Sequence, residues 1–162
     1  MKKCNTEIMK EIKKLESEKS SWVCHERNNC TVSYMSNEDP LIPDYDYNDT
    51  TESLKWFDDE IRRLKGLLAY SNATTIVDGF DMTINEALVY LAQLNEREKR
   101  LNYLISFKPI SRKTIGIDGK IEFTKILFDQ EDALKRYTAT KQEIMQLQMA
   151  IDRTNLTNFI EV

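Results

Sequence analysis

Residues 83–104, TINEALVYLAQLNEREKRLNYL, carry the strongest secondary-structure signal in this chain. The first four form a capping box, in which the side chains of Thr83 and Glu86 satisfy backbone N–H groups at the start of a helix. The leucines that follow are spaced as in a heptad repeat: Leu88, Leu91, Leu94, Leu101 and Leu104. The stretch therefore predicts a long helix with an apolar stripe.

Helical patterns recur on both sides of this stretch. The first covers roughly residues 3–21, where the apolar stripe is so thin that the helix needs a partner. Its members are Ile8, Ile12, Leu15 and Trp22. A second helix is expected from the cap Asp49-Thr-Thr-Glu52 to about Tyr70, and a last one from about Asp129 to about Thr154.

Residues 111–125 have the pattern of a β-hairpin, with a central Asp-Gly dipeptide that accepts positive φ at both turn positions. A two-residue turn there predicts that Ile117 pairs with Lys120 and Ile115 with Glu122. A lone hairpin is marginal in water, so we expect it to pack on a helix or to pair with another subunit.

Residues 23–50 break the helical pattern and form an irregular, acidic segment that contains Pro40 and Pro43. We expect one short strand within it, at Thr31–Met35. Such a long loop is uncommon in a compact domain, so we interpret it as an insertion or as part of a binding surface.

These patterns together predict a mainly α fold of about four helices in antiparallel, coiled-coil-like hairpins, with one β-hairpin. A length of 162 residues fits a single helical domain over residues 1–162. The chain is 41% hydrophobic, which suffices for a core, and 31% charged, which implies long, narrow helices with much solvated surface.

Charge is distributed unevenly along the chain. Residues 38–60 contain nine acids and one base, a net charge of −8, whereas residues 97–125 contain eight bases and three acids, a net charge of +5. Such blocks can meet within a subunit or between subunits, or the basic block can meet an anionic ligand. We favour mutual compensation and solvation, because charge runs usually coat exposed faces.

The basic block also has the composition of a nucleic-acid surface, because aromatic residues lie among its cations. Its members are Arg97, Lys99, Arg100, Lys108, Arg112 and Lys113, with Tyr103 and Phe107 nearby. The two aromatic residues also fall beside the leucine stripe, where core packing explains them. Nucleic acid is therefore not expected as a partner.

The cysteines are Cys4, Cys24 and Cys30, and the chain has one histidine, His25. A zinc site would need a second ligand pair, and a thiol nucleophile would need a third orienting group, so we predict no metal, no cofactor and no catalytic residue. With no apolar leader and no run of about 18 apolar residues, we expect a cytoplasmic protein with reduced thiols and no membrane contact.

Two distant stretches share one pattern. Residues 68–78 and 151–161 both read apolar, two spacers, Ser or Thr, Asn, any residue, Thr, and later an acid. We call this the Asn-x-Thr repeat, and it suggests two helical arms that deliver similar polar turns to one place. In one interpretation Asn72 and Asn155 end their helices in left-handed geometry.

In the other interpretation the repeat lines a polar pocket for a small anionic, nucleotide-like ligand, with an arginine as a bidentate donor. The residues of that candidate site are Asn72, Thr74, Thr75, Arg153, Asn155 and Thr157. We favour the helix-ending interpretation and keep the pocket as an alternative.

Several motifs together resemble a known family. They are Arg62-Arg-Leu-Lys-x-Leu-Leu, Asn72-Ala-Thr74-Thr, Asp78-Gly79, Thr83-Ile-x-Glu86-Ala87-Leu and Leu147-Gln-x-Ala-Ile151-Asp-x-Thr-Asn155-Leu-Thr157. Over about residues 52–162 the chain resembles small bacterial helical proteins that carry the label septicolysin. The resemblance implies helical hairpins with a β-hairpin, and it supplies no catalytic mechanism.

The function expected from these patterns is a non-enzymatic, self-associating structural or interaction protein that forms a homo-oligomer. Thin apolar stripes, open hairpin edges and opposite charge blocks all leave surface that an identical partner could cover. Binding of an anionic ligand at the Asn-x-Thr repeat is one alternative. The other is a metal-dependent phosphohydrolase that uses helical carboxylates such as Asp58, Asp59 and Glu60.

Overall fold

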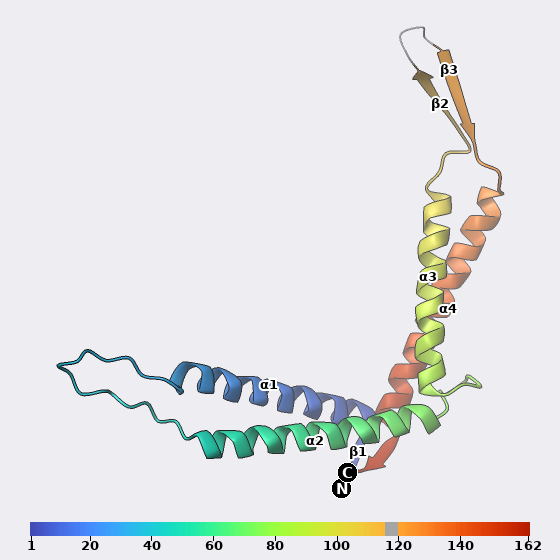
Figure 1. The fold of residues 1–162 in the computed structure, drawn as a ribbon. Coiled ribbons are helices and arrows are strands. Elements are labelled where there is room, and N and C mark those ends of the chain that lie inside the picture. Colours follow the sequence, from blue (N-terminus) through green and yellow to red (C-terminus); the bar gives the residue numbers. More distant parts are fainter. Residues whose placement is uncertain (116–119) are drawn as a thin grey trace. The chain divides into compact units, whose positions relative to one another are not determined.

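The computed structural model describes residues 1–115 and 120–162 (Figure 1). The helices within them are α1 (Asn5–Asn29), α2 (Tyr47–Thr74), α3 (Ile84–Ile105) and α4 (Gln130–Thr157). The strands are β1 (Lys2–Cys4), β2 (Ile110–Ile115), β3 (Lys120–Lys125) and β4 (Phe159–Glu161). The predicted mainly α fold of helical hairpins with a β-hairpin is confirmed.

Residues Met1–Thr75 and Asn155–Val162 form the first of two compact units. In it α1 and α2 lie side by side as a hairpin (Figure 1), and β1 pairs antiparallel with β4, with Cys4 opposite Phe159. The apolar core of this unit consists of Ile8, Ile12, Leu15, Phe57 and Leu64.

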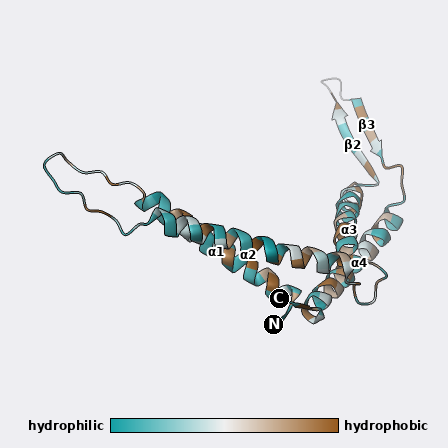
Figure 2. Cartoon of the chain, turned by 60° about the horizontal axis from the view of Figure 1, so that its bottom comes forward, coloured by the Kyte–Doolittle hydropathy of each residue, from teal (hydrophilic) through white to brown (hydrophobic). Residues whose placement is uncertain are grey.

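The core of the first unit follows a seven-residue period. The buried residues of α2 are Thr50, Phe57, Leu64 and Ser71, each seven positions after the last. Those of α1 are alternately three and four positions apart: Asn5, Ile8, Ile12 and Leu15. This spacing keeps one stripe of each helix toward its partner, and apolar and polar residues accordingly recur along the helices in Figure 2.

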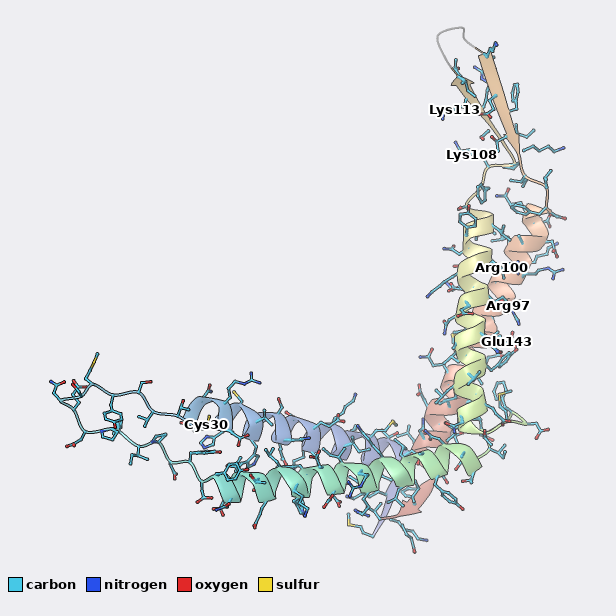
Figure 3. The ribbon with its side chains drawn as sticks, viewed as in Figure 1. Cys30, Arg97, Arg100, Lys108, Lys113 and Glu143 are labelled. Carbon is cyan, nitrogen blue, oxygen red and sulfur yellow. The ribbon has the colours of Figure 1, made fainter. Side chains whose placement is uncertain are left out.

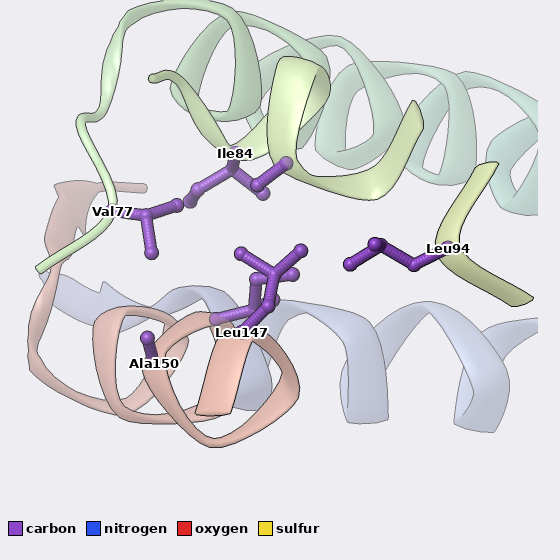
Figure 4. Packing of buried hydrophobic residues seen from close by; sticks show 7 residues of the cluster. Val77, Ile84, Leu94, Leu147 and Ala150 are labelled. Carbon is purple, nitrogen blue, oxygen red and sulfur yellow. The ribbon is translucent and has the colours of Figure 1, made fainter. Parts of the chain in front are cut away.

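Residues Ile76–Thr154 form the second unit, in which α3 and α4 lie side by side (Figure 1). The same period recurs here, with Ala87, Leu94 and Leu101 buried on α3. On α4 the buried residues at this spacing are Ala133, Thr140, Leu147 and Thr154. Figure 4 shows Leu94 and Leu147 in the core, together with Val77, Ile84 and Ala150. The predicted stripe is thus corrected at one position, because Ala87 is buried and Leu88 is exposed.

The register of the β-hairpin differs from the predicted one. Ile115 lies opposite Lys120 and Lys113 lies opposite Glu122, so the predicted pairing of Ile115 with Glu122 is wrong by two residues. The predicted turn, including Ile117, lies outside the described residues. A shift of two keeps each side chain on its predicted face, because side chains alternate with a period of two. All residues of both strands are exposed.

The irregular segment after α1 is shorter than predicted. α1 continues to Asn29, and its last turns contact the following loop, where the Tyr45 hydroxyl donates to the Glu26 carboxylate at 3.0 Å. Burial and this hydrogen bond raise the pKa of Tyr45 to about 12. The strand expected at Thr31–Met35 is wrong, because those residues form no regular structure.

The bounds of α2 also differ from the predicted ones. The helix begins at Tyr47, because Asp46 is its N-cap and accepts a hydrogen bond from the Asp49 N–H at 2.9 Å. It extends past Tyr70 to Thr74. An aspartate upstream of the predicted cap therefore starts the helix one turn early.

The capping box of α3 is present as predicted. The Thr83 N–H donates to the Glu86 carboxylate at 2.7 Å, and the Glu86 N–H donates to the Thr83 hydroxyl at 3.3 Å. We expect Thr83→Ala to lower the free energy of unfolding by about 1 kcal/mol, because the helix loses its cap. Urea titration followed by circular dichroism measures this. Asn85→Ala, an exposed position in the same turn, is the control, and an equal loss there would contradict the assignment.

Candidate functional site

A cluster of polar side chains lies within the first unit, where the start of α1 meets the ends of α2 and α4. Asn5 is fully buried, and its amide donates to the Asn155 side-chain oxygen at 3.0 Å. The Ser71 hydroxyl donates to the Asn5 side-chain oxygen at 3.0 Å. The Asn158 amide donates to Ser71 at 2.9 Å and to the Thr75 hydroxyl at 3.0 Å. We call these five residues the Asn5 cluster.

The chemistry of the Asn5 cluster is that of neutral amides and hydroxyls, which supply hydrogen-bond donors and acceptors but neither an acid nor a base. Each buried group has a partner inside the cluster, which is the condition under which a buried polar network stabilises a unique packing. The arrangement joins three chain segments and does not by itself activate a nucleophile.

The structure brings together two of the six residues predicted from the Asn-x-Thr repeat, namely Thr75 and Asn155. The repeat does deliver its two copies to one place, because Thr75 and Asn158 occupy corresponding positions and are hydrogen-bonded. The interpretation in which Asn72 and Asn155 adopt left-handed geometry is wrong: both lie inside helices, and neither has a positive φ.

The other predicted site residues are not members of the Asn5 cluster, although Thr74 is hydrogen-bonded to the Ser71 carbonyl. The Thr74 hydroxyl donates to the Tyr70 carbonyl at 2.9 Å, and Thr157 is the last residue of α4. Arg153 belongs to the second unit, where it pairs with Asp78 at 3.3 Å. Among the described residues, no group donates a hydrogen bond to the buried side-chain oxygen of Asn72. Ligand binding at the Asn-x-Thr repeat stays a prediction.

Sequence reasoning missed three members of the Asn5 cluster, although a signal for two of them existed. Asn5 stands seven residues before Ile12, and Ser71 stands seven residues after Leu64, so both occupy core positions of the repeat. A polar residue in such a position must find a partner when it is buried. Asn158 carried no such signal, because it follows the end of α4.

A second cluster lies in the second unit, where α3 and α4 form a groove of about 310 Å³ that we call the basic groove. It is lined by Arg97, Arg100, Leu101, Arg136, Ala139, Thr140 and Glu143. Figure 3 shows Arg97 and Arg100 along α3 and labels Glu143. The Tyr90 hydroxyl donates to the Glu143 carboxylate, and this hydrogen bond, with burial, raises the pKa of Tyr90.

A third feature is an apolar groove of about 770 Å³ along another face of α4 in the second unit. Its lining residues are Tyr137, Thr138, Lys141, Gln142, Ile144, Met145, Gln148, Met149 and Asp152. Met145 and Met149 are each 58% exposed. We call this surface the α4 face. Exposed thioethers of this kind mark surfaces that contact other molecules.

The cysteines and the histidine do not converge. Cys4 is buried, whereas Cys24 and Cys30 are exposed. The His25 imidazole donates through Nε2 to the Asp44 carbonyl oxygen, 3.1 Å away. Within residues 1–115 and 120–162, no three Cys, His, Asp or Glu side chains are placed to share a metal ion.

The three consecutive carboxylates of α2 each pair with a different cation. Asp58 pairs with Lys19 at 2.5 Å, Asp59 pairs with Arg62 at 2.7 Å, and Glu60 pairs with Arg63 at 2.7 Å. The last contact lowers the pKa of Glu60. The carboxylates therefore point in different directions, as their spacing on a helix requires.

Comparisons with known proteins establish the fold alone. No family model and no curated protein matches this chain. The solved structure of a functionally unknown conserved protein from Corynebacterium diphtheriae is similar, with a TM-score of 0.67 and 15% sequence identity. The similarity covers 99% of this chain and 100% of that one. In the part of the chain that the structure describes, no helix is both long and apolar enough to span a bilayer.

Proposed function

We propose that this protein is a non-enzymatic structural or interaction protein that self-associates through the α4 face. The observation that carries the proposal is the exposure of Met145 and Met149 beside a groove of about 770 Å³. In water such a surface is covered when a partner offers a matching apolar stripe, which is the arrangement of helices in coiled coils.

The partner that fits the α4 face is a second copy of α4 in antiparallel orientation. Lys141 and Asp152 both line the groove, so a twofold axis midway between them places Lys141 of one copy beside Asp152 of the other. The same axis places Ile144 opposite Met149. Both the charges and the apolar contacts are therefore self-complementary.

The amount of exposed surface supports association. The chain exposes 12269 Å², whereas a folded monomeric protein of this mass exposes about 8,400 Å². A hairpin of two helices covers only one stripe of each helix, so much of the helical surface stays in water. An identical partner would remove part of this area from water.

We expect the double variant Met145→Lys/Met149→Lys to shift the protein to the monomeric mass, because four ammonium groups would then face one another across the twofold axis. Light scattering coupled to size-exclusion chromatography, at several concentrations, measures the mass. Gln146→Lys is the control, because this exposed residue of the same helix does not line the groove. A monomeric wild type, or an unchanged mass in the double variant, would overturn the proposal.

A further inference from the structure

We propose that the basic groove binds a small phosphate-bearing anion through the guanidinium groups of Arg97, Arg100 and Arg136. The site differs from the α4 face in position, because its α4 residues lie on another side of that helix. It also differs from the Asn-x-Thr repeat, which lies outside the basic groove.

The charge of the basic groove is positive after its own ion pairs are counted. Arg136 pairs with Asp132 at 2.7 Å, and the Glu143 carboxylate accepts a hydrogen bond from Tyr90. Among residues 1–115 and 120–162, no carboxylate lies within ion-pair distance of Arg97 or Arg100. Neither guanidinium is in an ion pair within this part of the chain, although Arg97 interacts with the Tyr90 hydroxyl.

The spacing of the arginines suits a phosphate group. Arg97 and Arg100 are three residues apart on α3, so their side chains emerge from the same face one turn apart (Figure 3). Each guanidinium presents parallel N–H groups that match two oxygens of one phosphate. Arg136 reaches the groove from α4, so cations from two helices line it.

The rest of the groove limits the size of the ligand and provides apolar contacts for it. A volume of about 310 Å³ is at the lower end of the range for small-molecule sites. Leu101 and Ala139 line the same groove, so an organic group attached to the phosphate finds apolar contacts. Glu143, which accepts a hydrogen bond from Tyr90, carries a negative charge in the same groove and would repel an anion placed beside it.

The test uses inorganic diphosphate as the probe, titrated into the full-length protein by isothermal calorimetry at constant ionic strength. We expect saturable binding to the wild type and at least about a tenfold weaker affinity for Arg97→Gln/Arg100→Gln, because two charge-assisted contacts are lost. Both arginines are exposed, so this variant should fold. Its melting temperature, read by circular dichroism, verifies that it does.

The matched control is Lys99→Gln, which removes a cation from the same helix but from outside the groove. We expect its affinity to equal that of the wild type. No saturable heat with the wild type, or an equal weakening by Lys99→Gln, would overturn the proposal, the latter because the anion would then respond to total charge. Arg136→Gln should also weaken binding, and unchanged affinity there would overturn the assignment of Arg136 to the site.

Discussion

Leu94→Lys is expected to unfold the second unit, with a loss of about 4–5 kcal/mol in the free energy of unfolding. Leu94 is 0% exposed and packs in the core that includes Ala87 and Leu147. An ammonium group at that position has no anionic partner in the core and cannot reach water without breaking the contact between α3 and α4. Leu101→Lys, one heptad further along α3, should act in the same direction.

The measurement is urea unfolding followed by the circular-dichroism signal of the helices at ~222 nm. Gln93→Lys provides the control, because this neighbour of Leu94 is exposed and adds the same charge. If the urea-unfolding curve of Leu94→Lys coincided with that of Gln93→Lys, the Leu94 side chain would not be in a core. The assignment of α3 to a buried stripe would then fail.

The helices were predictable because their cores repeat with a fixed period. Leu94 and Leu101 stand seven residues apart in the sequence, and both are buried. The period alone did not distinguish Ala87 from Leu88, since both are apolar and adjacent. A small residue faces the core there, and size is not part of a binary pattern.

Contacts between distant residues were not predictable in the same way. β1 and β4 have three residues each and pair from opposite ends of the chain. Each is too short to show the alternation of apolar and polar residues that predicts a strand. The end of α1 was also missed. Its last turn is polar, and it is supported by the contact between Tyr45 and Glu26, which only the folded loop supplies.

In the candidate sites, too, local patterns were predictable and most contacts between distant residues were not. The Asn-x-Thr repeat correctly indicated that two helix ends meet, because Thr75 and Asn158 are hydrogen-bonded. The contacts of Thr74 and Arg153 did not follow from the repeat, because Thr74 donates to the Tyr70 carbonyl and Arg153 pairs with Asp78. The basic block already included Arg97 and Arg100, but the groove itself was not predicted, because Arg136 lies far along the sequence and joins them only when α4 packs beside α3.

Asn5→Ala is expected to lower the free energy of unfolding of the first unit by about 3 kcal/mol. The substitution removes both hydrogen bonds of Asn5, so the buried Ser71 hydroxyl loses its acceptor and the half-buried Asn155 oxygen loses its donor. Both tryptophans, Trp22 and Trp56, lie in this unit, so urea unfolding followed by tryptophan fluorescence reports on it directly.

The control is Asn28→Ala, which removes an exposed asparagine from the other end of α1 and should change stability by less than about 0.5 kcal/mol. Asn155→Ala should be destabilising as well, and the double variant should lose less than the two single losses combined, because the same hydrogen bond is removed only once. Strict additivity would mean that Asn5 and Asn155 act independently. In that case the hydrogen bond between Asn5 and Asn155 would not join α1 to the end of α4.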